Sequence, residues 1–504
     1  MKKIIKYSLL SLMAGGIVAC TGNFEEYNSD RYAPANITPD IVLPTMINAI
    51  LYTQQNDAQM VEGMIGQLGG HFSQTNRWGG QNFDTYNQSE GWNQEFYKLA
   101  FRDIYGNYFK VQQYTDNAGH WMAMANLVRA AAMARVSDTY GPIPYSQVKN
   151  GMMYVPYDDH REFYKTIIAD LEAAATTLYS YSQELPDSRP LGNGDLIYGG
   201  DYALWARFAN SMALRVAVRT ADEAAVQAIV AHPAGLIESN AHNAMKDPGA
   251  ESNPYYLHSA SWGELRVNAA IVDYMNGYND PRRSAYFTLA SISGHNRQYY
   301  GMPSGHASYT MSTAQGYSMP NFTATSKQPV FTAAETQFLL AEAALRGWIA
   351  GDAKTFYERG IELSMEQWGV SVGSYITDAT STPSSHTGDT FLGNYSRQTT
   401  VKIAWNAEST TEKHLEQIIT QKWIAIYPNP IEGWAEYRRT GYPELAPAVD
   451  NLSDGVVSSA RGARRLFYPL DERDYNTTNY QQAVSNLLGG PDTQATDLFW
   501  AKKN

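Results

Sequence analysis

The stretch from Thr332 to Trp348, TAAETQFLLAEAALRGW, constrains the fold of this chain more than any other segment. Its apolar residues recur at spacings of four and three, at Ala334, Phe338, Ala341, Leu345 and Trp348. This spacing places them in one stripe of an amphipathic helix. Gly351-Asp352 interrupts the pattern, and a second stripe follows at Ala353, Tyr357, Gly360 and Ile361. The sequence therefore predicts two helices that pack antiparallel across a short turn.

The second helix carries the A-x3-Y-x2-G spacing of a tetratricopeptide-type repeat, starting at Ala353. In such a unit a small residue, here Gly360, lets the paired helices approach closely, and an aromatic residue, here Tyr357, fills the gap. A single unit of this kind leaves its outer faces uncovered, so it needs stacked neighbours. We therefore expect further helix pairs in the chain.

Three other helix pairs are predicted from apolar residues at the same spacings. They join residues 121–137 with 159–178, 202–219 with 223–231, and 412–426 with 431–439. At 504 residues the chain exceeds the roughly 250 to 300 residues at which single cores stop growing. The predicted fold is all-α, with four tetratricopeptide-like pairs forming a scaffold and a more irregular sub-structure laid on it.

The irregular sub-structure is expected to come from three inserts without helical or strand periodicity, near residues 69–91, 241–328 and 377–406. The first, GGHFSQTNRWGGQNFDTYNQSEG, is rich in glycine and asparagine but also carries aromatic rings. Connections usually run about four to six residues, and much longer ones are functional or disordered. Disordered segments contain few aromatic residues, so a functional loop is the better interpretation.

The N-terminus has the pattern of a secretory leader. Residues 1–19 combine a basic start with a short apolar run, which is typical of a signal peptide and too short to span a membrane stably. The single cysteine, Cys20, follows Ile17-Val18-Ala19, which resembles a bacterial lipobox. We expect cleavage before Cys20 and its acylation, while an ordinary signal peptide with an incidental cysteine is the alternative.

The region after Cys20 is polar and acidic, so residues 20–37 are interpreted as a lipidated flexible tether to one large domain over residues 38–504. The formal charge is −12, and the loss of the three leader lysines takes it to −15. Binding of nucleic acid needs a basic face, so no nucleic-acid partner is expected. The 36 tyrosines and 11 tryptophans exceed what a core requires, which indicates exposed rings used in recognition.

Five segments resemble the SusD/RagB family of Bacteroidetes lipoproteins. They are 135–146 (RVSDTYGPIPYS), 201–219 (DYALWARFANSMALRVAVR), 335–348, 421–443 (QKWIAIYPNPIEGWAEYRRTGYP) and 464–476 (RRLFYPLDERDYN). The resemblance implies the all-helical fold, a lipid anchor in the outer membrane at the cell surface, and partnership with a SusC-like TonB-dependent transporter. It also implies capture of an oligosaccharide, or in some members a peptide. The acidic pair Glu25-Glu26 resembles the signal that sends such lipoproteins to the surface.

A sugar ring presents an apolar C–H face and a belt of hydroxyls, so its site needs an aromatic platform with polar neighbours. In the first insert, Trp78 is the expected platform and Arg77 supplies a planar fork of donors. The other candidates for glycan binding are Asn82, Asp84, Tyr86, Trp92, Trp262, Tyr299 and Tyr300. The alternative is that these rings only pin down long loops. The resemblance transfers the regions and none of the individual residues.

Catalysis and metal binding are not expected. Glycoside hydrolysis needs two carboxylates about 5 to 5.5 Å or about 6.5 to 9.5 Å apart, and neighbouring acids such as Asp158-Asp159 are better interpreted as surface charge. The chain contains no H-E-x-x-H and no G-x-S-x-G motif. His295 and His306 flank the Tyr299-Tyr300 pair, but no cysteine or helix-spaced histidine accompanies them.

These observations predict a lipid-anchored glycan-binding protein without cofactor, metal or enzymatic activity. Two alternatives stay open: the same fold binding peptides for import, and a glycoside hydrolase. The arginine cluster at Arg461, Arg464 and Arg465 is assigned to a structural C-terminal segment rather than to a site for anions.

Overall fold

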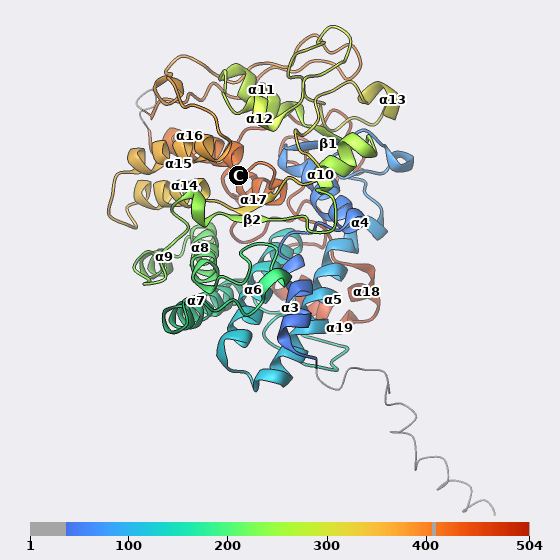
Figure 1. The fold of residues 1–504 in the computed structure, drawn as a ribbon. Helices are drawn as coiled ribbons and strands as arrows, with labels where there is room; N and C mark the ends of the chain where they lie inside the picture. The colour runs from blue at the N-terminus through green and yellow to red at the C-terminus, as the bar shows by residue number, and fades with distance from the viewer. Residues whose placement is uncertain (1–36, 406–409, 503–504) are drawn as a thin grey trace, which may run out of the picture. The chain divides into compact units, whose positions relative to one another are not determined.

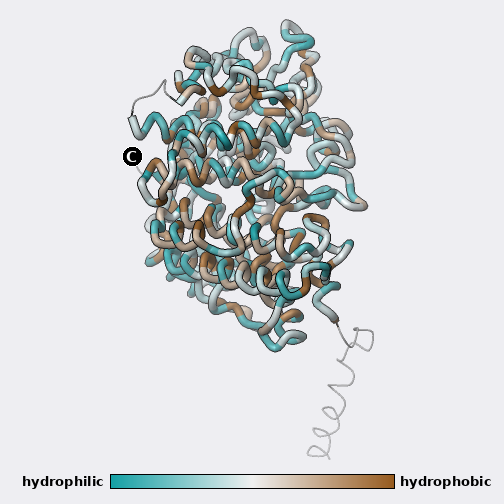
Figure 2. The backbone as a smooth tube through the Cα atoms, turned by 60° about the vertical axis from the view of Figure 1, so that its left-hand side comes forward, coloured by the Kyte–Doolittle hydropathy of each residue, from teal (hydrophilic) through white to brown (hydrophobic). Residues whose placement is uncertain are grey.

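Helices dominate the computed structural model, which describes residues 37–405 and 410–502 (Figure 1). The predicted signal peptide over residues 1–19, the predicted lipidation site Cys20 and residues 20–36 of the predicted tether lie outside the described residues. The chain from Pro39 onward forms one compact unit. No helix in the described part of the chain is long and apolar enough to cross a membrane. Figure 2 shows polar and apolar residues intermixed along the helices of this unit.

The four predicted helix pairs are confirmed. They are α6 (Gly119–Tyr140) with α7 (His160–Glu184), α8 (Tyr202–Thr220) with α9 (Glu223–Val230), α14 (Ala333–Leu345) with α15 (Ala353–Gln367), and α16 (Thr411–Ala425) with α17 (Pro430–Thr440). Packing between pairs joins them, because α7 lies against α8, and α14 lies against both α8 and α16 (Figure 1). The all-α scaffold is therefore continuous from the second quarter of the chain to its C-terminal part.

The α14–α15 pair shows why its glycine is needed. A Cβ atom on Gly360 would lie 2.8 Å from the ring of Phe338, closer than real Cβ atoms come to other atoms. Tyr357 fills the space beside this contact, with its ring 6.1 Å from that of Phe338 and its hydroxyl donating to the Ile403 carbonyl at 2.7 Å. The Thr332 hydroxyl caps α14 by accepting from the Glu335 N–H.

A buried network of charged side chains ties the pairs together. Arg215 on α8 pairs with Glu335 on α14 at 2.7 Å, and Arg219 pairs with Glu432 on α17 at 2.5 Å. Lys422 on α16 reaches Glu432 at 3.1 Å. The network continues through Asp138 with Arg219, and through Glu342 and Glu436 with Arg439. Removing one member of a buried pair leaves an uncompensated charge, so these contacts fix how the helices dock.

In the described part of the chain, four short strands that the sequence analysis did not predict lie in the first two inserts and at the end of the second. β1 (Phe72–Gln74) pairs antiparallel with β3 (Leu265–Val267), and β2 (Ala244–Lys246) pairs antiparallel with β4 (Gln328–Phe331). Strands of three or four residues are too short to show an alternating pattern. The β1–β3 pair, with Phe72 opposite Val267, joins the first insert to the second.

Short helices complete the inserts. The second insert holds α10 (Pro254–Tyr256), α11 (Ala269–Gly277), α12 (Arg283–Tyr286) and α13 (Met311–Ala314). In Figure 1, α11, α12 and α13 gather at the top, away from α7, α8 and α9. The third insert joins them because buried His386 bonds Asp273 on α11 at 3.1 Å. The remaining α-helices are α3 (Pro39–Asn48), α4 (Gln55–Ala58), α5 (Glu90–Thr115), α18 (Leu470–Asp474) and α19 (Thr477–Asn486).

Candidate functional site

The first insert places Trp78 in an unusual backbone conformation. Its φ of 47° lies in the left-handed region, which is rare for a residue with a bulky side chain. The Asn76 Oδ1 accepts the Trp78 N–H at 3.0 Å, and the Gly80 N–H donates to the Arg77 carbonyl at 2.7 Å. Such conformations persist only where the surroundings hold them, and they cluster at functional positions.

A network of side-chain amides holds the rest of the loop. Asn82 is fully buried, and its Oδ1 accepts from Gln67 Nε2 at 2.7 Å and from the Phe83 N–H at 2.9 Å. Asn87 Oδ1 accepts the Asn82 N–H at 3.2 Å, and its Nδ2 donates to the Gly80 carbonyl at 2.8 Å. Asn82, a predicted ligand for hydroxyls, is thus occupied in holding the loop together.

Trp78 and Trp92 form a corner of two rings. Their centroids are 5.2 Å apart and their planes meet at 86°. Trp92 lies in the first turn of α5, where the Ser89 hydroxyl caps the helix by accepting the Trp92 N–H. Both tryptophans are partly exposed. The structure therefore brings together two of the predicted rings on one surface.

Arg77, next to Trp78 in the chain, holds the loop in place through its side-chain contacts. Its guanidinium bonds Asp84 at 3.2 Å and the Thr85 hydroxyl at 3.1 Å, and its side chain is only 10% exposed. It also lies 5.5 Å from the ring centre of Tyr309, whose hydroxyl donates to the Gln74 carbonyl. The sequence analysis missed Tyr309, because it belongs to a segment without periodicity and comes next to the loop only through folding.

Trp262 lies on the segment next to the loop. The Thr75 N–H donates to the Glu264 carbonyl at 2.8 Å, and Asn76 Nδ2 donates to the Glu264 carboxylate at 3.2 Å. The Trp262 ring packs on His258 at 5.0 Å and is partly exposed. We call the four partly exposed rings in this neighbourhood, Trp78, Trp92, Trp262 and Tyr309, the aromatic face.

Tyr299 and Tyr300 do not join the aromatic face. Tyr300 is 6% exposed, stacks on His295 at 3.6 Å and donates to the Thr387 carbonyl at 2.9 Å. Tyr299 is partly exposed and lies 5.8 Å from the guanidinium of Arg283. Tyr300 belongs to a small hydrophobic cluster on which Tyr309 packs, so it supports the aromatic face from behind.

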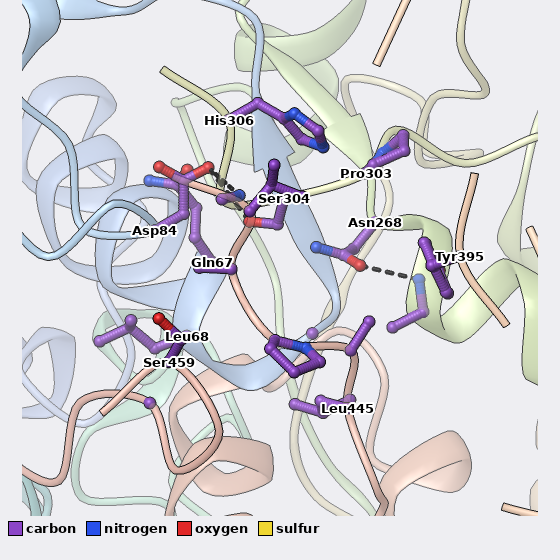
Figure 3. A pocket seen from close by; sticks show the side chains of 18 of the residues that line it. Gln67, Leu68, Asp84, Asn268, Pro303, Ser304, His306, Tyr395, Leu445 and Ser459 are labelled. Carbon is purple, nitrogen blue, oxygen red and sulfur yellow. Dashed lines mark hydrogen bonds between the residues drawn. The ribbon is translucent and has the colours of Figure 1, made fainter. Parts of the chain in front are cut away.

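A cavity of about 150 Å³ lies beside Asp84 (Figure 3). Asp84 and Tyr86, both predicted site residues, line it, and Asp84 Oδ2 accepts from the Gly305 N–H at 2.8 Å and from the Ser304 hydroxyl at 3.2 Å. The other walls come mainly from residues 67–70, 303–306, 392–398, 445–449 and 459–463. No motif in the sequence marks these segments, and they meet only in the folded chain.

The cavity combines apolar and polar walls. Leu68, Pro303 and Leu445 lie on it together with Gln67 and His306 (Figure 3). Burial lowers the pKa of His306, against the opposing attraction of Asp450 and Asp84, so the ring is neutral at pH 7. Burial likewise raises the pKa of the Tyr86 hydroxyl. In the described part of the chain, no three histidine, cysteine, aspartate or glutamate side chains gather as metal ligands would.

The comparison with protein families decides where the chain belongs. A family model described as "SusD-like: Susd and RagB outer membrane lipoprotein" matches residues 23–501. The chain belongs to the SusD-like family. Among curated proteins no significant match is found.

Solved structures of SusD-like proteins share this fold. A SusD-like protein from Bacteroides thetaiotaomicron is 37% identical, with a TM-score of 0.88 over 93% of this chain and 99% of the other. A SusD homolog from Bacteroides uniformis is 35% identical, with a TM-score of 0.86 over 92% and 99%. A chitin-binding SusD homolog from Flavobacterium johnsoniae is 30% identical, with a TM-score of 0.87 over 92% and 99%. The all-α expectation and the family resemblance are thereby confirmed.

Proposed function

We propose that this SusD-like protein is a cell-surface lipoprotein of the outer membrane that binds oligosaccharide and delivers it to a SusC-like TonB-dependent transporter. Acylation of Cys20 anchors it. The description of the family as outer-membrane lipoproteins supports the location, and the chitin-binding homolog supports a glycan as ligand. The proposed activity is capture without covalent chemistry.

The Trp78–Trp92 corner is the observation that carries the glycan proposal. A pyranose ring covers an indole with its C–H face, while a second indole at 86° closes one side of the sugar. The held loop fixes this corner before any ligand arrives, so little ordering entropy is lost on binding. Trp262 and Tyr309 lie on segments that bond the same loop, and they offer rings for further sugars.

The predicted site residues take different roles in this proposal. Trp78, Trp92 and Trp262 contact the glycan, and Arg77 braces Tyr309 and Asp84 from behind. Asp84 and Tyr86 face the cavity, which is treated separately below. Asn82 and Tyr300 support the loop and Tyr309, and Tyr299 lies outside the contact surface.

Calorimetric titration with panels of neutral oligosaccharides and of peptides tests the proposal, together with chromatography of the incubated sugars. We expect at least one oligosaccharide to bind and to be recovered intact. If peptides bind and no glycan does, the ligand is a peptide and the proposal of a glycan ligand is wrong. Release of shorter sugars would show a hydrolase instead of a binding protein.

A further inference from the structure

The cavity behind Asp84 differs from the aromatic face in shape and chemistry. We infer that it is a second saccharide subsite that takes one terminal, neutral sugar ring. This inference rests on the proposed glycan binding, but it concerns different residues. Asp84 divides the two places: one carboxylate oxygen bonds Arg77 on the side of the aromatic face, and the other bonds Gly305 and Ser304 on the rim of the cavity.

The size of the cavity sets the size of its occupant. A volume of about 150 Å³ matches that of a cavity that holds benzene, and a pyranose with its hydroxyl groups is larger than benzene. The cavity is partly open, so one pyranose is accommodated with some of its hydroxyls outside, and a second sugar lies outside. A longer glycan enters with its end alone, whereas the partly exposed rings of the aromatic face place no such limit on chain length.

Two polar side chains of the lining, Gln67 and His306, differ in how far a ligand can reach them. Gln67 is 3% exposed, and its Nε2 donates to the Met64 carbonyl at 3.1 Å and to Asn82 at 2.7 Å, while its Oε1 has no donor in the described part of the chain. This oxygen is itself buried, so a ligand in the cavity does not reach it. His306, partly exposed at the rim, makes no hydrogen bond to another described side chain.

Another polar side chain of the lining, Asn268, already makes its hydrogen bonds within the protein. Asn268 donates from Nδ2 to the Phe72 carbonyl at 3.2 Å and to the Ser73 hydroxyl at 3.0 Å. Its Oδ1 accepts the Ala270 N–H at 2.8 Å (Figure 3). Of these three side chains, His306 rather than Gln67 or Asn268 is therefore open to a ligand hydroxyl.

The charges around the cavity favour a neutral ring. Neither lysine nor arginine appears among the described residues that line it, so an acidic sugar finds no cation there. Asp84 is paired with Arg77 and has both carboxylate oxygens occupied. Leu68, Pro303 and Leu445, on different sides of the cavity, supply apolar surface for the C–H groups of a pyranose (Figure 3).

The test compares two variants of the cavity with one of the aromatic face. Ala446→Phe fills the cavity from a partly exposed position, and His306→Ala removes a polar group that has no side-chain partner. The probes are glucose, galactose, mannose, xylose, N-acetylglucosamine and, as an acidic control, glucuronate. Binding is measured by ligand-observed NMR and calorimetry, with thermal unfolding as the check on folding.

We expect at least one neutral monosaccharide to bind the unaltered protein and to lose tenfold or more in affinity in both cavity variants. Trp78→Ala should change the affinity for this monosaccharide less than twofold. The subsite is refuted if oligosaccharide still binds the unaltered protein but no monosaccharide does, or if both cavity variants keep their monosaccharide affinity. If glucuronate binds more tightly than every neutral monosaccharide, the inference that the subsite takes a neutral ring is refuted. If Ala446→Phe fails to fold, His306→Ala decides alone. If no glycan of any length binds the unaltered protein, the proposed function itself is refuted.

Discussion

The helical scaffold and the aromatic face bury polar groups in opposite ways. In the scaffold, full charges pair across helices far apart in the chain, as between Arg219 and Glu432. Under the aromatic face, neutral amides such as Asn82 and Asn87 bond within a few residues, and the charge pair between Arg77 and Asp84 is also local. Long-range charge pairs fix how the scaffold docks, and short-range amides fix one loop. The residues that decide the fold and those proposed to decide the ligand therefore form separate sets.

The largest expected effect comes from breaking the scaffold network at Glu432. This carboxylate pairs with Arg219 at 2.5 Å and with Lys422 at 3.1 Å, so Glu432→Ala removes the partner that these two buried cations share. Arg219 then keeps Asp138, and Lys422 keeps Glu436 at 3.5 Å. We expect the free energy of unfolding to fall by about 3 to 5 kcal/mol in chemical denaturation. Glu184→Ala, on the exposed end of α7, is the matched control and should change it by less than about 0.5 kcal/mol. Equal losses of stability in the two variants would contradict the claim that the buried charge network holds the scaffold together.

The scaffold and the third insert should lose stability at opposite ends of the pH scale. Burial lowers the pKa of His386 in the third insert, but hydrogen bonds to Asp273 and Asp389 outweigh it and raise the pKa to about 9. This stabilisation is complete below about pH 6.5 and is lost as the pH rises through 9. For Glu432, burial raises the pKa, but Arg219, Lys422 and Arg215 outweigh it and lower the pKa to about 2. Its contribution is present above about pH 4.5 and is lost as the pH falls through 2.

Unfolding free energies measured from pH 6 to pH 10 test the alkaline half of this comparison. We expect the contribution of His386 to decline by about 3 kcal/mol, taken as the difference between the unaltered protein and His386→Asn, since one unit of pKa corresponds to about 1.4 kcal/mol. Burial lowers the pKa of Lys246 to about 7, which stabilises both proteins as the pH rises and cancels in the difference. His386→Asn should flatten the decline while leaving the loss of stability in acid unchanged. A parallel decline in both proteins would show that His386 does not hold the inserts.

Two glycines sharpen the comparison at a smaller scale. Gly360→Ala drives a Cβ to 2.8 Å from Phe338 within a helix pair, so it should cost about 1 to 3 kcal/mol through overpacking. Gly79→Ala meets no atom within 4 Å, but Gly79 has a φ of 74°, so about 1 kcal/mol of backbone strain is expected. Thermal unfolding measures both, and a larger cost at Gly79 would contradict the proposed reasons.

The sequence predicted the helix pairs because apolar spacing reports directly on helices that bury one stripe. The Tyr357 and Gly360 pattern was informative for the same reason, since their neighbours lie one short turn away. The three-residue strands were missed, because alternation needs more positions than they offer. Helical periodicity also gives no sign of which charges pair, so the Arg219–Glu432 contact could not be predicted.

The site could be predicted only in part. Trp78 and Trp92 lie 14 residues apart, and the unusual composition around them singled out the region. Tyr309 and the cavity could not be predicted from the sequence, because their contacts join segments hundreds of residues apart, such as Tyr309 with Gln74. Tyr300 was indistinguishable from an exposed ring until its stacking on His295 was seen.

The most direct test of the account compares Trp78→Ala with Trp348→Ala. Both remove a partly exposed tryptophan, but Trp348 lies beside Arg346 in the scaffold and Trp78 in the aromatic face. In calorimetric titration with the oligosaccharide that binds the unaltered protein, Trp78→Ala should lose about tenfold in affinity, equivalent to about 1.4 kcal/mol, and Trp348→Ala less than twofold. Unchanged affinity in Trp78→Ala, or an equal loss in both variants, would contradict the assignment of glycan binding to the aromatic face.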